Sequence, residues 1–323
     1  MRVLVFLFIF SIILLTSCSK AVSKPSQTNT DTISQNSFPK ATYDITKLND
    51  CTLFNSIPNI VNMARQDYKE ISGVAPSHIN KGVLYVHEDS GNANDIYLTD
   101  STGADLGKVV LDGIFNRDWE DIATGPGPVP GKSYIYIADI GDNDLKYSTK
   151  YIYRFEEPAL NTIAASTEIH IYQVDKIEVK LSEGIANAET LVINPSTKDL
   201  FLFTKERGSS LCYAIPYPQS VASVITIKPI VKLPFDLLTG GDISADGNAL
   251  ILRDKGQIWY WSISDGATLQ STLLSKPQNA PYAGNEPQGE GVCFSVNNTG
   301  YFTNTEIKKY PNAISTLSFY KKL

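Results

Sequence analysis

Three glutamates stand at one recurring place in this sequence, directly ahead of short apolar runs. Glu120 precedes the run DIA, Glu189 precedes TLV and Glu290 precedes GVC. Asp121 follows Glu120, and Asp242 occupies the corresponding position of a fourth run. Carboxylates that converge from separate parts of a chain repel one another unless a cation or a basic side chain offsets their charge. Such a set can hold a hard divalent cation such as calcium, or it can accept protons in catalysis.

More polar residues stand at the end of the second apolar run of each segment. They include His87, Asp139, Lys205 and Arg253, and the turn Asp139–Asp144, which reads DIGDND, adds Asp142 and Asn143. Lys205 and Arg253 could offset the acidic charge without any metal ion. The turn lacks the spacing of an EF-hand loop, so by itself it is a weak indication of a metal site.

The elements that must position these residues are short strands in a repeat of roughly fifty residues, a period near that of propeller blades. The five segments start at Ser72, Glu120, Glu189, Gly241 and Glu290. Each contains β-branched and aromatic runs that are separated by turn residues, as in YIYIADIGDN, ALILRDK, QIWYWSIS and STLLS. An insertion around Asn161–His170 delays the third segment. No segment has the long 3.6-residue period of an amphipathic helix.

This repeat predicts an all-β fold, a β-propeller with five blades. The fifth segment lacks its fourth strand, and Cys51–Ile57 is expected to supply it from the N-terminal side and so close the ring. A six-bladed ring is the alternative, if the long second segment splits. In a propeller the first strand of each blade lines the central channel, so the three glutamates are expected to meet at one mouth of it.

The candidate ligand-binding residues at that mouth are Glu120, Asp121, Asp139, Asp142, Asn143, Glu189, Lys205, Arg253 and Glu290. If the mouth binds a metal ion such as calcium, the expected ligands are Glu120, Glu189 and Glu290. For catalysis, the candidate bases are Glu120, Glu189 and His87. In the alternative interpretation, hydrated polar side chains at the mouth only hold the blades in register.

The N-terminus has the features of a lipoprotein leader. Met1–Ser17 is a predicted signal peptide with one basic residue and an apolar run too short to span a bilayer of ~30 Å comfortably. It ends in Leu15-Thr16-Ser17-Cys18, which resembles a bacterial lipobox with Cys18 as the acylated residue. Residues 18–42 are expected to form the lipidated Cys and a polar tether, and residues 43–323 the propeller. The predicted location is the bacterial cell envelope, anchored by lipid to the outer membrane.

Composition narrows the range of partners. The formal charge is −6 and no basic cluster occurs, so nucleic acid is not expected as a partner. Beyond Cys18, three cysteines remain, and they have no CxxC spacing that would indicate zinc. The expected partners are the membrane, through the lipid anchor, and a small molecule, glycan or protein ligand.

Several motifs together resemble a group of secreted bacterial propellers. They are EISGVA, NRDWEDIA, YIYIADIGDN, NAETLVINPSTKDLFLFTK, GGDISADGNALILR and PQGEGVCF, between about Glu70 and Glu306. The chain is similar in style to the SdiA-regulated family and to the phytase-like propellers credited with esterase activity. The resemblance implies a secreted or lipid-anchored propeller, and by analogy with calcium-dependent phytases a phosphoester substrate. The dense carboxylate set of those enzymes is only partly present here.

Two functions therefore compete. The first is a cell-envelope lipoprotein that binds an anionic ligand at the acidic channel mouth, through a divalent cation together with Lys205 and Arg253. The alternative is a metal-dependent phosphoester or ester hydrolase of the phytase-like type, in which the cation polarises the substrate or its attacking water. The absence of a nucleophile motif such as GxSxG favours binding.

Overall fold

The computed structural model describes residues 38–161 and 163–323, and Phe38–Leu323 form one compact unit. The predicted signal peptide, Cys18 and the tether up to residue 37 lie outside the described residues. The compact unit begins slightly before Tyr43, the predicted start of the propeller domain.

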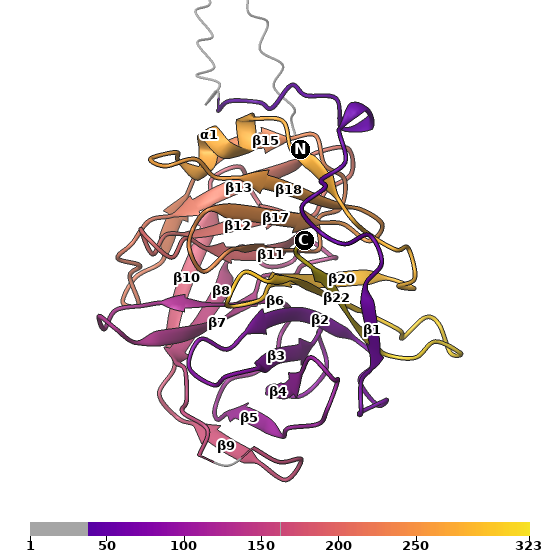
Figure 1. Ribbon diagram of the computed structural model, residues 1–323. Helices are drawn as coiled ribbons and strands as arrows, with labels where there is room; N and C mark the ends of the chain where they lie inside the picture. The colour runs from indigo at the N-terminus through magenta and orange to yellow at the C-terminus, as the bar shows by residue number, and fades with distance from the viewer. Residues whose placement is uncertain (1–37, 162) are drawn as a thin grey trace, which may run out of the picture. The chain divides into compact units, whose positions relative to one another are not determined.

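The described chain forms five sheets whose four principal strands are antiparallel, and each sheet corresponds to one predicted repeat (Figure 1). Blade 1 contains β2 (Ile71–Pro76), β3 (Val83–Glu88), β4 (Asp95–Asp100) and β5 (Lys108–Leu111). Blade 2 contains β6 (Trp119–Pro126), β7 (Ser133–Asp139), β8 (Lys150–Glu156) and β10 (Asp175–Leu181). Blade 3 contains β11 (Ala188–Ile193), β12 (Leu200–Thr204), β13 (Ser210–Ile215) and β15 (Pro229–Leu233). Blade 4 contains β16 (Gly240–Ile243), β17 (Ala249–Arg253), β18 (Ile258–Ser262) and β19 (Gln278–Ala280). Blade 5 contains β20 (Gly289–Phe294), β21 (Gly300–Thr305), β22 (Thr316–Lys321) and β1 (Asn59–Asn62).

The innermost strands close a ring. Strands β2, β6, β11, β16 and β20 contact one another in that order, and β20 returns to β2. The five-bladed prediction is confirmed, and the six-bladed alternative is wrong. The long second segment does not split into two blades, because its insertion instead adds one outer strand, and the third segment adds another. Strand β9 (Glu168–Ile171) pairs in parallel with β5 of blade 1, and β14 (Ile225–Ile227) pairs in parallel with β10 of blade 2.

The ring is closed from the N-terminal side, by a strand that lies later than expected. Strand β1 pairs antiparallel with β22, with Ile60 opposite Ser318 and Val61 opposite Leu317. The predicted closing segment Cys51–Ile57 contributes only the bridge between Phe54 and Lys322. Turn residues in this segment and Pro58 precede the extended stretch, which therefore begins at Asn59.

The segment Phe38–Asn62, here called the N-terminal belt, runs along the outer edges of three blades (Figure 1). Lys40 forms a parallel bridge with Lys232 of β15, and Asp50 forms one with Asn279 of β19. The belt includes the short 3₁₀ helix η1 (Ile45–Lys47) and ends in β1. With β9 and β14 on blades 1 and 2, every blade receives a segment at its outer edge, which limits exposed backbone hydrogen-bonding groups.

One predicted strand is a helix. The run STLLS at positions 271–275 lies mostly in α1 (Leu269–Leu274). The hydroxyl of Thr268 accepts a hydrogen bond from the backbone N–H of Ser271, and this N-cap favours a helix over the strand that the leucines suggested. The fourth strand of blade 4 is instead β19, which follows this helix.

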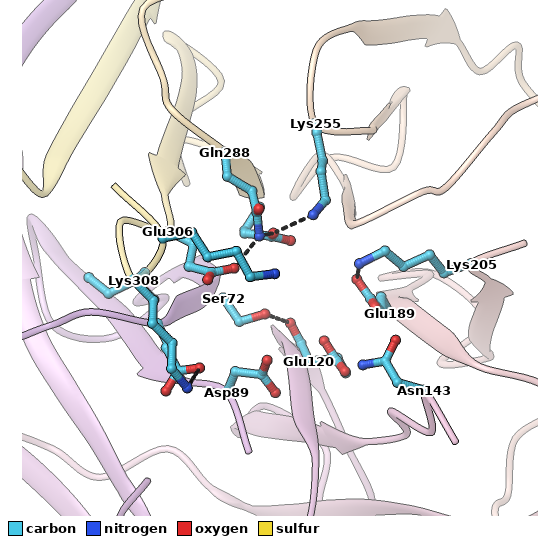
Figure 2. A pocket seen from close by; sticks show the side chains of 14 residues that line it. Ser72, Asp89, Glu120, Asn143, Glu189, Lys205, Lys255, Gln288, Glu306 and Lys308 are labelled. Atoms are coloured by element: carbon cyan, nitrogen blue, oxygen red, sulfur yellow. Dashed lines mark hydrogen bonds and ion pairs between the residues drawn. The ribbon is translucent and has the colours of Figure 1, made fainter. Parts of the chain in front are cut away.

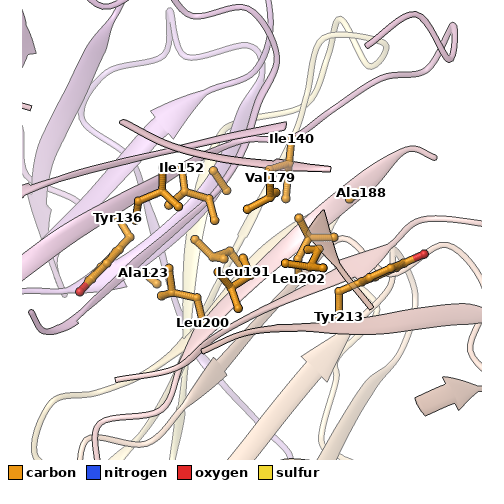
Figure 3. Close-up of a cluster of buried hydrophobic side chains, with 14 of the residues drawn as sticks. Ala123, Tyr136, Ile140, Ile152, Val179, Ala188, Leu191, Leu200, Leu202 and Tyr213 are labelled. Carbon is orange, nitrogen blue, oxygen red and sulfur yellow. The ribbon is translucent and has the colours of Figure 1, made fainter. Parts of the chain in front are cut away.

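The apolar faces of neighbouring blades pack on one another. Between blades 2 and 3, Ile152 and Val179 face Leu191 and Leu202 in a buried cluster (Figure 3). Similar clusters lie between the other blades, so the cores sit around the ring and leave the channel to polar side chains. Among the residues that the structure describes, no helix is long and apolar enough to cross a membrane.

Candidate functional site

A cavity of about 260 Å³ opens at the channel mouth where the innermost strands begin (Figure 2). We call it the mouth cavity. It is lined by Glu70, Ile71, Ser72, Asp89, Glu120, Asn143, Glu189, Lys205, Lys255, Gln288, Glu290, Glu306, Lys308 and Lys309. The structure therefore brings Glu120, Glu189 and Glu290 to one place, together with Lys205 and Asn143. At the opposite end of the channel only about 10 Å³ of space remains.

The three glutamates sit at irregularities of their strands. The pairing register shifts between Trp119 and Asp121, between Ala188 and Thr190, and between Gly289 and Val292. Each shift leaves the glutamate outside the regular ladder, and such a bulge re-aims a side chain. Blade 1 has the same shift around Ser72, whereas β16 of blade 4 pairs regularly and offers no glutamate. The repeated bulge explains why these carboxylates face the cavity.

Glu189 and Glu290 each have a lysine nearby. Lys205 forms an ion pair with Glu189, and the Asn187 amide donates to Glu189 Oε1 at 3.1 Å. Gln288 donates to Glu290 Oε1 at 2.6 Å, and Lys255 Nζ lies 3.9 Å from the same oxygen. Each of these two glutamates thus has a lysine ammonium group close to its carboxylate.

Glu120 has a different environment. One oxygen each of Asp89, Asp118 and Glu120 lie within 4.8 Å of one another, in a group we call the acidic triad. Glu120 is 3% exposed, and its Oε1 has no hydrogen-bond partner in the described part of the chain. Gly141 leaves room for this arrangement, because a Cβ there would lie 2.1 Å from Glu120 Oε1 and 2.5 Å from Asp118 Oδ2.

Burial raises the pKa of five acids in this region: Asp89, Asp118, Glu120, Glu189 and Glu290. The pKa of Asp89 is raised to about 7, by burial first and by the charge of Asp118. Burial and the charge of Glu189 raise the pKa of Glu120 well above its usual value. Burial raises the pKa of Glu290 to about 8, although Lys205 opposes the shift. The uncompensated carboxylates therefore favour either a proton or a bound cation.

The wall beside Asn143 is held by a buried ion pair. Lys150 Nζ lies 3.0 Å from Asp142 Oδ2, and both side chains are almost completely buried. The Asp142 carboxylate also accepts hydrogen bonds from the backbone N–H groups of Lys146 and Tyr147. Asp142 was a candidate ligand residue, but here its carboxylate organises the loop that carries Asn143 into the mouth cavity.

Three other candidates do not line the cavity. Asp121 is buried and accepts hydrogen bonds from the backbone N–H groups of Ile122 and Leu191. Asp139 is fully buried and lies 3.3 Å from Arg117 Nε. His87 is also fully buried, with Nδ1 3.1 Å from the carbonyl oxygen of Glu88. Burial lowers the pKa of His87 to about 4, so the ring is neutral and lies away from the site where a base would act.

Arg253 was expected at the channel mouth, but it does not line the mouth cavity. Its guanidinium is completely buried and pairs with Glu286 Oε2 at 2.8 Å, with a further hydrogen bond to the carbonyl oxygen of Gly291. Gly289 permits this packing, since a Cβ there would collide with the guanidinium. Arg253 joins blade 4 to blade 5, and the positive charge at the cavity comes instead from Lys205, Lys255, Lys308 and Lys309.

The sequence analysis missed Asp89 and Asp118 as site residues. Asp89 follows the run VLYVHE directly, at the strand end expected to reach the mouth. Asp118 stands two positions before Glu120, and alternate residues of a strand share a face. Both signals were present in the printed sequence, although neither residue fell in the repeated glutamate position.

The site and fold stand without support from sequence relatives. No protein-family model matches the chain, and no curated protein matches it. The assignment as a five-bladed β-propeller with an acidic mouth cavity accordingly comes from the geometry itself.

Proposed function

We propose that the mouth cavity binds an anionic ligand through a divalent cation, and that the acidic triad of Asp89, Asp118 and Glu120 holds the cation. The observation that carries this proposal is the buried, unpartnered Oε1 of Glu120 beside two further carboxylates. An unpaired buried charge is costly, and a bound cation removes that cost.

The pairing of the other acids supports this choice of ligands. Lys205 offsets Glu189, Lys255 lies near Glu290, and Lys308 pairs with Glu70. The triad is left with excess negative charge, and it offers oxygen atoms only. Calcium and magnesium prefer oxygen ligands, so a hard cation fits better than zinc or copper.

The cation would leave positions open toward the cavity, where an anionic group of a ligand could bind. Lys255 of blade 4 lies across the cavity from Asp89, whereas Lys308 of blade 5 lies beside Asp89 and pairs with Glu70 (Figure 2). This arrangement favours a small ligand whose negative charge faces both the cation and Lys255.

Calcium and magnesium titrations of Phe38–Leu323, followed by calorimetry and thermal melting, test the cation site. At a free cation concentration about 100 times Kd, binding adds about 2.7 kcal/mol of stability, which raises the melting temperature by several degrees. Asp118→Asn and Glu120→Gln should weaken binding by about tenfold or more. Glu189→Gln, the matched control, should retain the shift because Lys205 already neutralises that residue.

An absence of any shift with either cation in the parent protein would remove the metal from the proposal. Equal losses in Glu189→Gln and Glu120→Gln would instead return the site to the three glutamates. Inorganic phosphate, titrated with calcium and with chelator, then tests the anion, which should bind measurably only with the cation present.

We further propose that the protein is a bacterial cell-envelope lipoprotein, acylated at Cys18 after removal of Met1–Ser17. The support is the apolar leader that ends in Leu15-Thr16-Ser17-Cys18. Metabolic labelling with a fatty-acid analogue should mark the parent and not Cys18→Ala, which should also leave the membrane fraction. A Cys18→Ala chain that remains uncleaved and membrane-bound would show that the leader itself is the anchor.

A further inference from the structure

The connection between β8 and β10 forms a strap that links blade 2 to the outside of blade 1. It leaves β8 at Glu157, carries β9, and returns at Asp175 to begin β10. Strand β9 pairs in parallel with β5, with Ile169 opposite Val109 and Ile171 opposite Leu111. The strap therefore covers the outer edge of a blade to which it does not belong in sequence.

One end of the strap is fixed by a buried carboxylate. Glu157 is 3% exposed, and its Oε1 accepts hydrogen bonds from the Ser77 hydroxyl, from the Tyr85 hydroxyl at 3.0 Å and from the His78 N–H at 3.1 Å. Three donors from blade 1 hold this end of the strap.

The other end is held by a histidine between two carboxylates. His170 Nδ1 lies 2.7 Å from Asp112 Oδ2, and His170 Nε2 lies 3.0 Å from Glu168 Oε1. Ionised carboxylates only accept hydrogen bonds, so both ring nitrogens must donate. Only the imidazolium form of histidine carries a proton on both nitrogens.

We infer that His170 is a pH-sensitive latch, which holds β9 on blade 1 while the ring is protonated and loosens β9 when one ring proton leaves. Of the two carboxylates, Glu168 belongs to β9 itself, so only the contact with Asp112 ties β9 to blade 1. Loss of a ring proton either breaks this contact or leaves it as a neutral hydrogen bond, which is roughly half as strong as a charge-assisted one. Strand β9 is otherwise lightly held, because its residues Glu168 and His170 are exposed and Ile169 and Ile171 only half-buried. Loosening uncovers backbone groups along β5, an edge able to pair with another strand.

A neighbouring lysine holds β9 independently of the histidine. Lys108 on β5 lies 3.5 Å from Glu168 Oε2 and 3.0 Å from Asp95 Oδ2 on β4, so it adds a contact that does not change near neutral pH. The hydrogen bond to Asp112 is the largest of the effects that raise the pKa of His170 above its usual value. With the folded pKa above the unfolded one, the stabilisation is complete below the unfolded pKa and is lost as pH rises through the folded pKa.

Hydrogen exchange of the strap at about pH 5.5 and about pH 8.5 tests the latch, with rates expressed as protection factors so that intrinsic pH effects cancel. Peptides covering Glu168–Ile171 should lose roughly two- to fivefold in protection at the higher pH, the range for an exposed ion pair. In His170→Gln that loss should disappear. Peptides covering β18 are the internal control and should be unchanged in both proteins.

Two results would overturn the latch. One is equal protection of β9 at both pH values in the parent, and the other is the same loss in His170→Gln, which would assign the effect to other groups. An NMR titration gives an independent check, since the chain has only three histidines and His78 and His87 are the other two. A His170 pKa at or below about 6.5 would also contradict the proposal.

Discussion

The Asp121 carboxylate crosses the interface between blades 2 and 3, where its Oδ2 accepts a hydrogen bond of 2.9 Å from the backbone N–H of Leu191. Asp242 makes the corresponding contact between blades 4 and 5, with the N–H of Phe294 at 2.8 Å. Consecutive positions of the innermost strand thus have separate tasks. The glutamate position faces the mouth cavity, and the aspartate position ties neighbouring blades together.

Asp121→Ala tests the structural role of the aspartate position. The change leaves the buried Leu191 N–H without its acceptor, at a cost of about 1–3 kcal/mol, and the melting temperature should fall by several degrees. Glu120→Gln in the presence of chelator is the matched control, because its carboxylate has an unpartnered oxygen and little to lose. A melting temperature for Asp121→Ala equal to that of the parent would show that the contact carries no stability.

Asp242 gives a pH dependence whose sign can be worked out. Burial raises its pKa from 3.8 to about 7. The folded protein therefore keeps a proton that the unfolded chain has lost, and this stabilisation declines as pH rises from about 4 to about 7. Asp242→Asn cannot titrate, so its unfolding free energy should decline less steeply over this window, by at most about 1.4 kcal/mol per pH unit. Parallel slopes in denaturant melts of the two proteins would refute the assignment.

Gly141→Ala tests the acidic triad without changing its charge. The new methyl group would lie within van der Waals radii of Glu120 Oε1 and Asp118 Oδ2, so both carboxylates must move. The calcium-induced rise in melting temperature should disappear. Gly256→Ala is a matched control, since its Cβ would meet no atom within 4 Å. A full calcium shift in Gly141→Ala would place any bound cation away from the triad.

Truncations of the N-terminal belt separate its two parts. A chain that begins at Pro58 keeps β1 and loses the contacts along blades 3 and 4 together with the Phe54 bridge to Lys322 at the end of blade 5, so it should melt moderately below Phe38–Leu323. A chain that begins at Met63 loses β1, leaves the edge of β22 open and should melt much lower or aggregate. If the two truncations melt at the same temperature, β1 does not close the ring.

The repeat made the blade count and the meeting of three glutamates predictable, because both depend on periodicity. The bulges at Glu120, Glu189 and Glu290 were not predictable, since a register shift depends on partner strands. The prediction placed Arg253 at the cavity, but Lys255 lies there instead, and the cause is similar. Arg253 belongs to the regular end of β17 and is packed beneath Gly289, whereas Lys255 lies in the following loop and reaches the cavity.

The predictions of a strand at STLLS and of the closing strand at Cys51–Ile57 were wrong for local reasons. Leu273 and Leu274 satisfy the apolar pattern of a strand, but the Thr268 cap decides the conformation. The acidic triad was not predicted for a long-range reason. Asp89 belongs to blade 1, and Asp118 directly precedes the first strand of blade 2. Their meeting depends on the ring, which places the end of one blade's second strand beside the next blade's first strand.

The N-terminal belt also determines how this fold would bear a mechanical load. With the lipid anchor that we propose, tension enters the domain at its N-terminal end and meets the backbone bonds of Ala41 to Lys232 and of Cys51 to Asn279 before it reaches β1. Bonds arranged in series along a strip open one after another at low force. The outer strip could therefore peel from two blades and lengthen the tether while β1 keeps the ring, and the cavity at its mouth, intact.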